Sequence, residues 1–178
     1  MKTKTVYRIF VDYEKEEKWL NEMAEKGWAL ESFRFMRYRF RSVEPGMYTY
    51  RIELLRELPS HPDSKAYMAF MTEVGIEVVD TSYRWVFLRK RTSDGSFQLY
   101  SDFDSMIQRE TRIIQLYGTV LLANFVVVLA NFSNPVAKWT ILLNIVVVAM
   151  LAYAVQHHTR KMRTLKGLKE IGEMKSED

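Results

Sequence analysis

Arginine side chains recur at close spacing in the segment FRFMRYRFR, residues 33–41. A guanidinium carries a permanent positive charge and five N–H donors, so it binds carboxylates and phosphates strongly. Alternate side chains of a strand share a face, and a β-bulge between Phe35 and Arg37 would place Phe35 on the apolar face and the arginines on the other. The predicted partner-binding surface comprises Arg34, Arg37, Arg39 and Arg41 of this strand and Arg84 and Trp85 of a later one.

Aromatic and basic residues on one sheet would also suit RNA, as in the RRM domain. That domain requires a glycine-containing motif with aromatic residues at fixed spacing. The segment SYRWVFLRK, residues 82–90, contains no glycine. No nucleic-acid partner is therefore expected, and attraction of the arginines to an anionic membrane surface is a simpler interpretation.

Candidate catalytic groups are few. His61 lies in a loop before a predicted helix, and His157 and His158 flank an apolar segment. The chain has no cysteine, no HExxH, no GxSxG and no glycine-rich phosphate loop, which excludes thiolate chemistry and the common hydrolase and nucleotide motifs. The sequence predicts a protein that is not an enzyme and needs no cofactor or metal.

Residues 1–101 are expected to form a cytoplasmic domain of short strands and helices. A predicted strand, residues 5–11, precedes a helix over residues 14–26, whose apolar face includes Trp19 and Leu20. Gly27 is the residue expected to end that helix in a left-handed conformation. Trp28 then opens the next strand.

A weak internal repeat is visible in this domain. MAEKGWALES, residues 23–32, matches MTEVGIEVVD, residues 71–80, and VYRIF, residues 6–10, resembles TYRIE, residues 49–53. Ile76 stands in the place of Trp28, so this position calls for a large apolar core residue rather than an indole. The fourth strand, residues 83–88, is apolar on both faces and is expected to be covered on both sides or to lie at an interface.

The order of elements predicts the α+β ferredoxin-like fold, β-α-β-β-α-β, with an extra hairpin strand. The hairpin would turn at Asp94-Gly95 and end in a strand over residues 97–103. Two helices on one face of an antiparallel sheet leave the other face open. The arginines are expected on that open face.

Two apolar runs, residues 113–132 and 136–155, each have about the 20 residues that a helix needs to cross a bilayer. A connecting helix, residues 102–112, precedes this transmembrane hairpin of residues 113–155, and a basic tail, residues 156–178, follows it. By the positive-inside rule both ends lie in the cytoplasm of a protein of the cell membrane. The tail is interpreted either as a solvated helix or as an amphipathic helix on the inner leaflet, with membrane-surface residues Arg160, Lys161, Arg163 and Lys166.

Polar residues within the apolar runs are few. Asn124 and Asn144 lie at equal distances from the turn and hence at similar depth. Their amides could hold the two helices together or contact the helices of a partner. No Asp, Glu or Arg lies in the middle of either run, which argues against a proton relay or ion pathway.

The segments EKWLNEMAEKGWAL (residues 17–30), YTYRIELL (48–55) and GIEVVDTSYRWVFLRK (75–90), ahead of a two-helix hairpin, resemble a family of uncharacterised Firmicutes membrane proteins. That family is a domain of unknown function, often encoded beside PadR-type regulators. The resemblance implies a role in envelope-stress or toxic-compound response, but it implies no activity.

We therefore expect a membrane-anchored interaction or sensor module that binds a protein partner or a ligand, or associates with itself, through its open sheet face. The alternative is an accessory subunit of a membrane transporter that acts through its hairpin.

Overall fold

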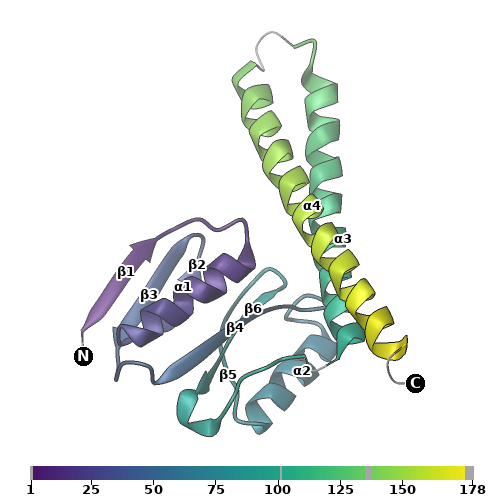
Figure 1. Ribbon diagram of the computed structural model, residues 1–178. Coiled ribbons are helices and arrows are strands. Elements are labelled where there is room, and N and C mark those ends of the chain that lie inside the picture. The colour runs from purple at the N-terminus through teal and green to yellow at the C-terminus, as the bar shows by residue number, and fades with distance from the viewer. Residues whose placement is uncertain (1, 101, 135–137, 175–178) are drawn as a thin grey trace. The chain divides into compact units, whose positions relative to one another are not determined.

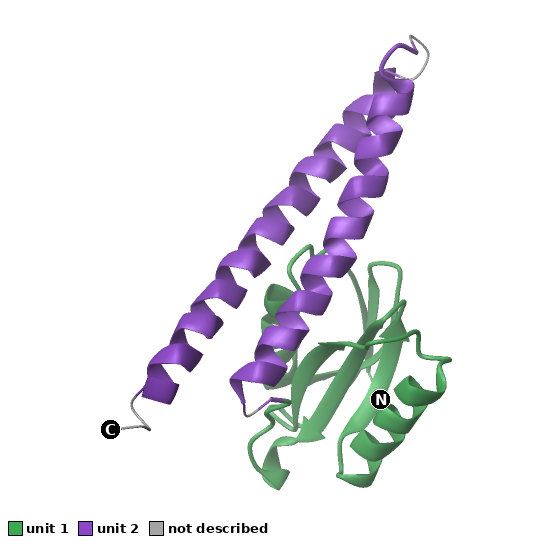
Figure 2. Ribbon diagram, turned by 90° about the vertical axis from the view of Figure 1, so that its right-hand side faces the viewer, with its two compact units in different colours: residues 1–99 green, residues 100–178 purple. Residues whose placement is uncertain are grey.

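The computed structural model describes residues 2–100, 102–134 and 138–174. The chain forms two compact units, residues 1–99 (unit 1) and 100–178 (unit 2), shown in Figure 2. Each unit is described by itself below.

Unit 1 is an α+β domain in which the order strand, helix, strand, strand occurs twice (Figure 1). The first half contains β1 (Thr3–Tyr7), α1 (Tyr13–Glu25), β2 (Trp28–Arg34) and β3 (Arg37–Ser42). The second half contains β4 (Tyr48–Leu54), α2 (Pro62–Glu73), β5 (Glu77–Ser82) and β6 (Trp85–Arg91).

The strands form two antiparallel three-stranded sheets, sheet A with the order β1-β3-β2 and sheet B with the order β4-β6-β5. The α+β class is confirmed, whereas the ferredoxin-like arrangement is not, because each half closes a sheet of its own.

The segment predicted as one bulged strand is a hairpin. Phe35 and Met36 form the turn between β2 and β3 with positive φ angles of 41° and 65°. Phe35 is 85% exposed and does not lie on the apolar face. A two-residue turn interrupts the apolar alternation as a bulge does, and without the usual Asn-Gly it is hard to recognise. The β5–β6 turn is similar, with Tyr83 at a φ of 55°.

The predicted terminal hairpin is absent from the described residues. A short 3-10 helix, η1 (Thr92–Asp94), follows β6, and Gly95 has a φ of 93°. Residues 96–100 form no strand, Ser101 lies outside the described residues, and Phe103 begins a helix. Phe97 is buried with Leu55 and Val86 instead, so its apolar side chain is accommodated without strand pairing.

The helix and hairpin of the two halves are equivalent at a constant offset. Gly27 and Gly75 end the two helices with φ angles of 78° and 81°. A register irregularity occurs between Leu30 and Ser32 of β2 and, at the same offset, between Val78 and Asp80 of β5. The repeat predicted for this part of the chain is therefore present in three dimensions.

The first strand of each half aligns differently from the sequence prediction. Thr3 pairs with Arg41, and Tyr50 pairs with Arg89, which is the counterpart of Arg41. Thr3 is therefore the structural equivalent of Tyr50, and the matched segments VYRIF and TYRIE are not equivalent. The sequence similarity of these segments did not predict which residues are equivalent, because the register of each first strand is set by its pairing with the third strand of the same half.

The core of unit 1 lies on both sides of β6. Trp19 of α1 packs edge-on against Tyr38 and Phe40, with ring centroids 4.9 and 5.6 Å away. Val86 and Leu88 of β6 belong to a second cluster, toward which α2 contributes Tyr67 and Met68. Phe87, which alternates with Val86 and Leu88, is buried as well, and its ring lies 5.0 Å from that of Phe33 in β2. Of the two alternatives expected for this strand, cover on both sides is therefore the one that the burial supports. Trp28 is only half-buried, and the ammonium of Lys4 lies 5.5 Å from the centre of its ring.

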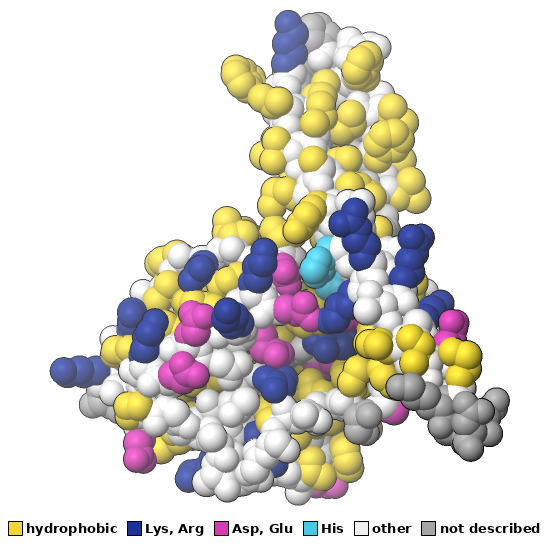
Figure 3. All heavy atoms as spheres, viewed as in Figure 1, with side chains coloured by type: hydrophobic (Ala, Val, Ile, Leu, Met, Phe, Trp, Pro, Cys, Tyr) yellow, Lys and Arg dark blue, Asp and Glu magenta, His cyan; other side chains and the backbone are white. Residues whose placement is uncertain are grey.

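Unit 2 is a pair of long helices, α3 (Phe103–Asn131) and α4 (Lys138–Met174). Both are long and apolar enough to cross a membrane. The predicted connecting helix, residues 102–112, is the beginning of α3, with Asp102 as its N-cap. The predicted tail continues α4 as far as Met174. Ser133 and Asn134 of the predicted turn follow α3, whereas its last residue, Pro135, lies outside the described residues. Figure 3 shows hydrophobic side chains along much of this helical pair, with Lys and Arg toward its two ends.

Candidate functional site

The four predicted arginines of the first half lie on one face of sheet A, which we call the arginine face. In β3, Tyr38 and Phe40 are buried, whereas Arg37 and Arg39 are exposed. Strand pairing places Thr5 opposite Arg39 and Tyr7 opposite Arg37. The arginine face therefore comprises Arg34, Arg37, Arg39 and Arg41, bordered on β1 by Thr3, Thr5 and Tyr7.

Positive charge on the arginine face is poorly neutralised. The guanidinium of Arg39 lies 3.1 Å from a carboxylate oxygen of Glu31, and no other ion pair involves the four arginines within the described part of the chain. Arg34 lies directly opposite Arg37 across the hairpin. Like charges in opposite positions destabilise a sheet, so this face is well suited to bind carboxylates or phosphates.

Arg84 and Trp85 were predicted as part of the same surface, but Arg84 lies in the β5–β6 turn and Trp85 begins β6 of sheet B. The Arg84 guanidinium donates a hydrogen bond of 2.9 Å to the carbonyl of Leu55. The Trp85 ring stacks on Tyr13 of α1 with a centroid distance of 5.4 Å. The structure thus assigns both side chains contacts within the fold and does not bring them to the arginine face.

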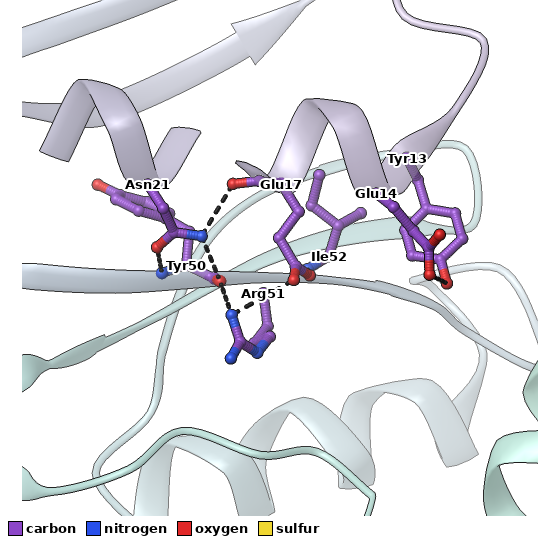
Figure 4. A network of polar contacts seen from close by, with 7 residues as sticks. All are labelled: Tyr13, Glu14, Glu17, Asn21, Tyr50, Arg51 and Ile52. Atoms are coloured by element: carbon purple, nitrogen blue, oxygen red, sulfur yellow. Dashed lines mark hydrogen bonds and ion pairs between the residues drawn. The ribbon is translucent and has the colours of Figure 1, made fainter. Parts of the chain in front are cut away.

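Two polar side chains of α1 bond to the backbone of β4 at the outer edge of sheet B (Figure 4). The Asn21 carboxamide accepts a hydrogen bond from the Tyr50 N–H (2.8 Å) and donates one to the Tyr50 carbonyl (3.1 Å). Glu17 accepts from the Ile52 N–H (2.9 Å) and pairs with Arg51 (3.3 Å). These bonds satisfy the backbone groups that an edge strand otherwise exposes.

The edge-sealing role of Glu17 and Asn21 was missed in the sequence. The available signal was two polar residues one helical turn apart beside the apolar face of α1.

The facing edges of the two sheets are bridged by side chains. Asp80 of β5 accepts a hydrogen bond from the Phe33 N–H of β2 (2.8 Å). Arg89 of β6 donates to the Leu30 carbonyl (3.0 Å), and the Leu30 N–H donates to the Tyr50 hydroxyl (2.8 Å). These contacts place β2 firmly beside sheet B.

A carboxyl group that titrates near neutrality lies at the start of α1. The Tyr38 hydroxyl donates a hydrogen bond of 2.6 Å to Glu16. Burial raises the pKa of Glu16 to about 7, although the bond from Tyr38 opposes this change. Burial and the neighbouring carboxylate also raise the pKa of Tyr38. Glu16 is thus able to exchange a proton in the physiological range.

Unit 2 contains a buried charge cluster just outside the predicted spans. Glu110 and His158 are each 1% exposed, and a Glu110 carboxylate oxygen lies 2.7 Å from His158 Nδ1. The Lys161 ammonium lies 3.0 Å from the other oxygen. Burial alone would raise the pKa of Glu110, but the bond to His158 and the charge of Lys161 outweigh it and hold the pKa below its usual value.

This cluster was not foreseen, because it joins residues distant in sequence. His158, which follows the second apolar run, is buried, and Lys161, one of the predicted membrane-surface residues, bonds to Glu110. The other predicted surface cations, Arg160, Arg163 and Lys166, are exposed.

The asparagines of the apolar runs satisfy their amide nitrogens locally. Asn124 donates to the carbonyl of Val120, and Asn144 donates to the carbonyl of Thr140, each at 2.8 Å. Each of these hydrogen bonds lies within its own helix. Within residues 2–100, 102–134 and 138–174, no group of His, Asp or Glu side chains is arranged to hold a metal ion.

A family model described as "Protein of unknown function (DUF2812)" matches residues 12–122, from the residue that caps α1 into α3. No curated protein and no solved structure matches the chain.

Proposed function

The chain belongs to the DUF2812 family of proteins of unknown function, and from this starting point we propose that it is a non-enzymatic, membrane-anchored interaction module. In this proposal unit 1 lies in the cytoplasm and binds an acidic partner through the arginine face. The α3–α4 pair holds unit 1 at the cell membrane.

The observation that carries the proposal is the opposition of Arg34 and Arg37 on an exposed sheet face. Two like charges in this arrangement lower the stability of the hairpin. An anionic group bound between them would remove that repulsion and accept several charge-assisted hydrogen bonds. The arrangement therefore favours partner binding over a purely structural role.

Membrane anchoring is supported by the two long apolar helices and by the distribution of charge. Arg109 and Arg112 precede the first apolar run and a larger basic group follows the second, whereas Lys138 is the one Lys or Arg near the turn. This distribution favours a cytoplasmic location for both ends. The resemblance to proteins encoded beside PadR-type regulators supports a role in envelope-stress or toxic-compound response.

The test is crosslinking with mass spectrometry in native membranes, comparing two charge-matched double variants. Arg34→Gln with Arg37→Gln removes charge from the arginine face, whereas Lys65→Gln with Arg91→Gln removes the same charge from exposed positions elsewhere in unit 1. We expect the first variant alone to lose crosslinks to an acidic protein partner.

Equal capture of that partner by both variants would contradict the assignment of the arginine face. Crosslinks that run instead from α3 and α4 to a multi-span protein, and loss of function when residues 113–155 are replaced by an unrelated hairpin, would favour the accessory subunit of a transporter.

A further inference from the structure

The outer edge of β1 presents backbone groups that β3 does not use. Hydrogen bonds from the Ser42 N–H to the Lys2 carbonyl (2.8 Å) and from the Arg8 N–H to the Met36 carbonyl (2.9 Å) fix which residues pair through their backbone. In an antiparallel ladder such pairs alternate. The N–H and C=O groups of Thr3, Thr5 and Tyr7 therefore point away from β3.

In the second half of the repeat, the equivalent edge strand, β4, has its outward backbone groups bonded by side chains of α1. Tyr50 and Ile52, the counterparts of Thr3 and Thr5, are sealed by Asn21 and Glu17 of α1 (Figure 4).

In α2 the positions that correspond to Glu17 and Asn21, at the offset from Gly27 to Gly75, are Lys65 and Ala69. Neither side chain can accept a hydrogen bond from a backbone N–H. Among the described residues of unit 1, none bonds to the outward groups of Thr3, Thr5 or Tyr7. An open edge of this kind is a template for a further strand.

Charge identifies the kind of strand that fits. Thr3 and Thr5 are short and lie opposite Arg41 and Arg39. Neighbouring strands are about 4.8 Å apart, so the long Arg41 side chain can extend over Thr3 to a strand placed beyond β1. Arg39 can extend over Thr5 in the same way once it exchanges its pair with Glu31 of β2 for a carboxylate of the added strand. Lys4 adds a cation in β1 itself. A second copy of β1 would bring a further lysine, Lys4, and no carboxylate, whereas an acidic segment would neutralise the cations present.

We propose that β1 accepts an extended acidic peptide segment as an additional strand, which pairs with the backbone of Thr3, Thr5 and Tyr7 and whose carboxylates bind Arg39 and Arg41. This inference rests on the proposed function and specifies the partner of the same face.

The test uses the full chain in lipid nanodiscs and a fluorescent, end-blocked peptide that alternates glutamate with valine. Binding is followed by fluorescence anisotropy, with a peptide that alternates lysine with valine as the control. Thr5→Pro removes an outward N–H and leaves the ladder with β3 intact, since proline is tolerated at the solvent side of an edge strand. Thr5→Ala keeps that N–H and is the matched control.

We expect the Kd of the acidic peptide to rise about tenfold or more in Thr5→Pro and to change little in Thr5→Ala, because only the proline removes a backbone hydrogen bond. Arg39→Gln with Arg41→Gln should weaken binding similarly. Hydrogen exchange of the wild-type chain supplies a measurement that does not depend on folding of the variants. Bound peptide should slow exchange at the amides of Thr3, Thr5 and Tyr7.

Unprotected amides, or unchanged binding to Thr5→Pro alongside weakened binding to the arginine variant, would overturn strand addition while leaving the arginine face as the binding surface. Unchanged binding to both variants would overturn the inference but not the proposed function, which is tested separately by Arg34→Gln with Arg37→Gln. A doubled mass in sedimentation that Thr5→Pro abolishes, without peptide binding, would identify a second copy as the occupant and overturn the acidic peptide.

Discussion

Replacing Asn21 by alanine tests whether α1 seals the edge of sheet B. Asn21 accepts from the Tyr50 N–H and donates to the Tyr50 carbonyl, and Tyr50 is fully buried at 0% exposure. A buried backbone group left without a partner costs about 1–3 kcal/mol. Water can reach part of this edge because Asn21 is itself only half-buried. We therefore expect a loss of about 2 kcal/mol of stability for unit 1.

Single-residue hydrogen exchange separates this variant from a merely destabilised one. In Asn21→Ala the Tyr50 amide loses its acceptor, and its protection should fall by about tenfold or more relative to the rest of β4. Glu17→Ala should instead expose the Ile52 amide, which bonds to Glu17. Glu22→Ala, at another half-buried position of α1, is the matched control and should change neither amide selectively.

The result that would refute the edge-sealing role is a uniform change. If both single variants increased exchange equally at Tyr50 and Ile52, the side chains would act through general packing of α1. If neither amide changed, the hydrogen bonds would contribute nothing to the order of the strand edge.

Three further outcomes follow from the contacts described. Glu16 has a pKa of about 7 in the folded chain against an ordinary value of 4.5, so between these pH values the folded state binds a proton that the unfolded state has lost. Thermal unfolding should therefore show stability decreasing as pH rises from about 4.5 to about 7. Glu16→Gln should flatten that dependence. Glu110→Ala removes the buried carboxylate that contacts both His158 and Lys161. It should destabilise the helical pair in detergent by about 3 kcal/mol. Asp104→Asn, in an exposed pair, should change circular-dichroism melting little. Gly27→Ala should lower the melting temperature of unit 1 more than Gly75→Ala does. Both glycines have a positive φ, but only a Cβ added at Gly27 would lie 2.9 Å from a backbone carbonyl oxygen. Equal shifts in melting temperature would show that backbone strain alone decides the effect.

Sequence patterns predicted correctly those features that depend on a single helix or strand. The helix predicted over residues 14–26 is α1 within one residue at each end, and Gly27 has the expected left-handed conformation. Both follow from helical periodicity and from the conformational freedom of glycine. The arginines of residues 33–41 also lie on one face, although the predicted bulge is a turn.

Features that depend on pairing between distant residues could not be predicted. Phe35 and Tyr83 adopt left-handed backbone conformations that cost an ordinary residue about 1 kcal/mol, and the pairing of the flanking strands must offset that cost. Glu110 and His158 meet only because α3 and α4 lie side by side. Sequence patterns carry no direct record of such contacts.

The unequal sealing of the sheet edges sets a limit on assembly. Two three-stranded sheets have four outer edges. The edges of β2 and β5 lie beside each other, and β4 is closed by Glu17 and Asn21. Within the described part of unit 1, no side chain closes β1 in this way. A chain with two open edges could add neighbours without end and form a fibre. With one open edge among the described residues, unit 1 would add a single strand, so the proposed strand addition would stop after one partner.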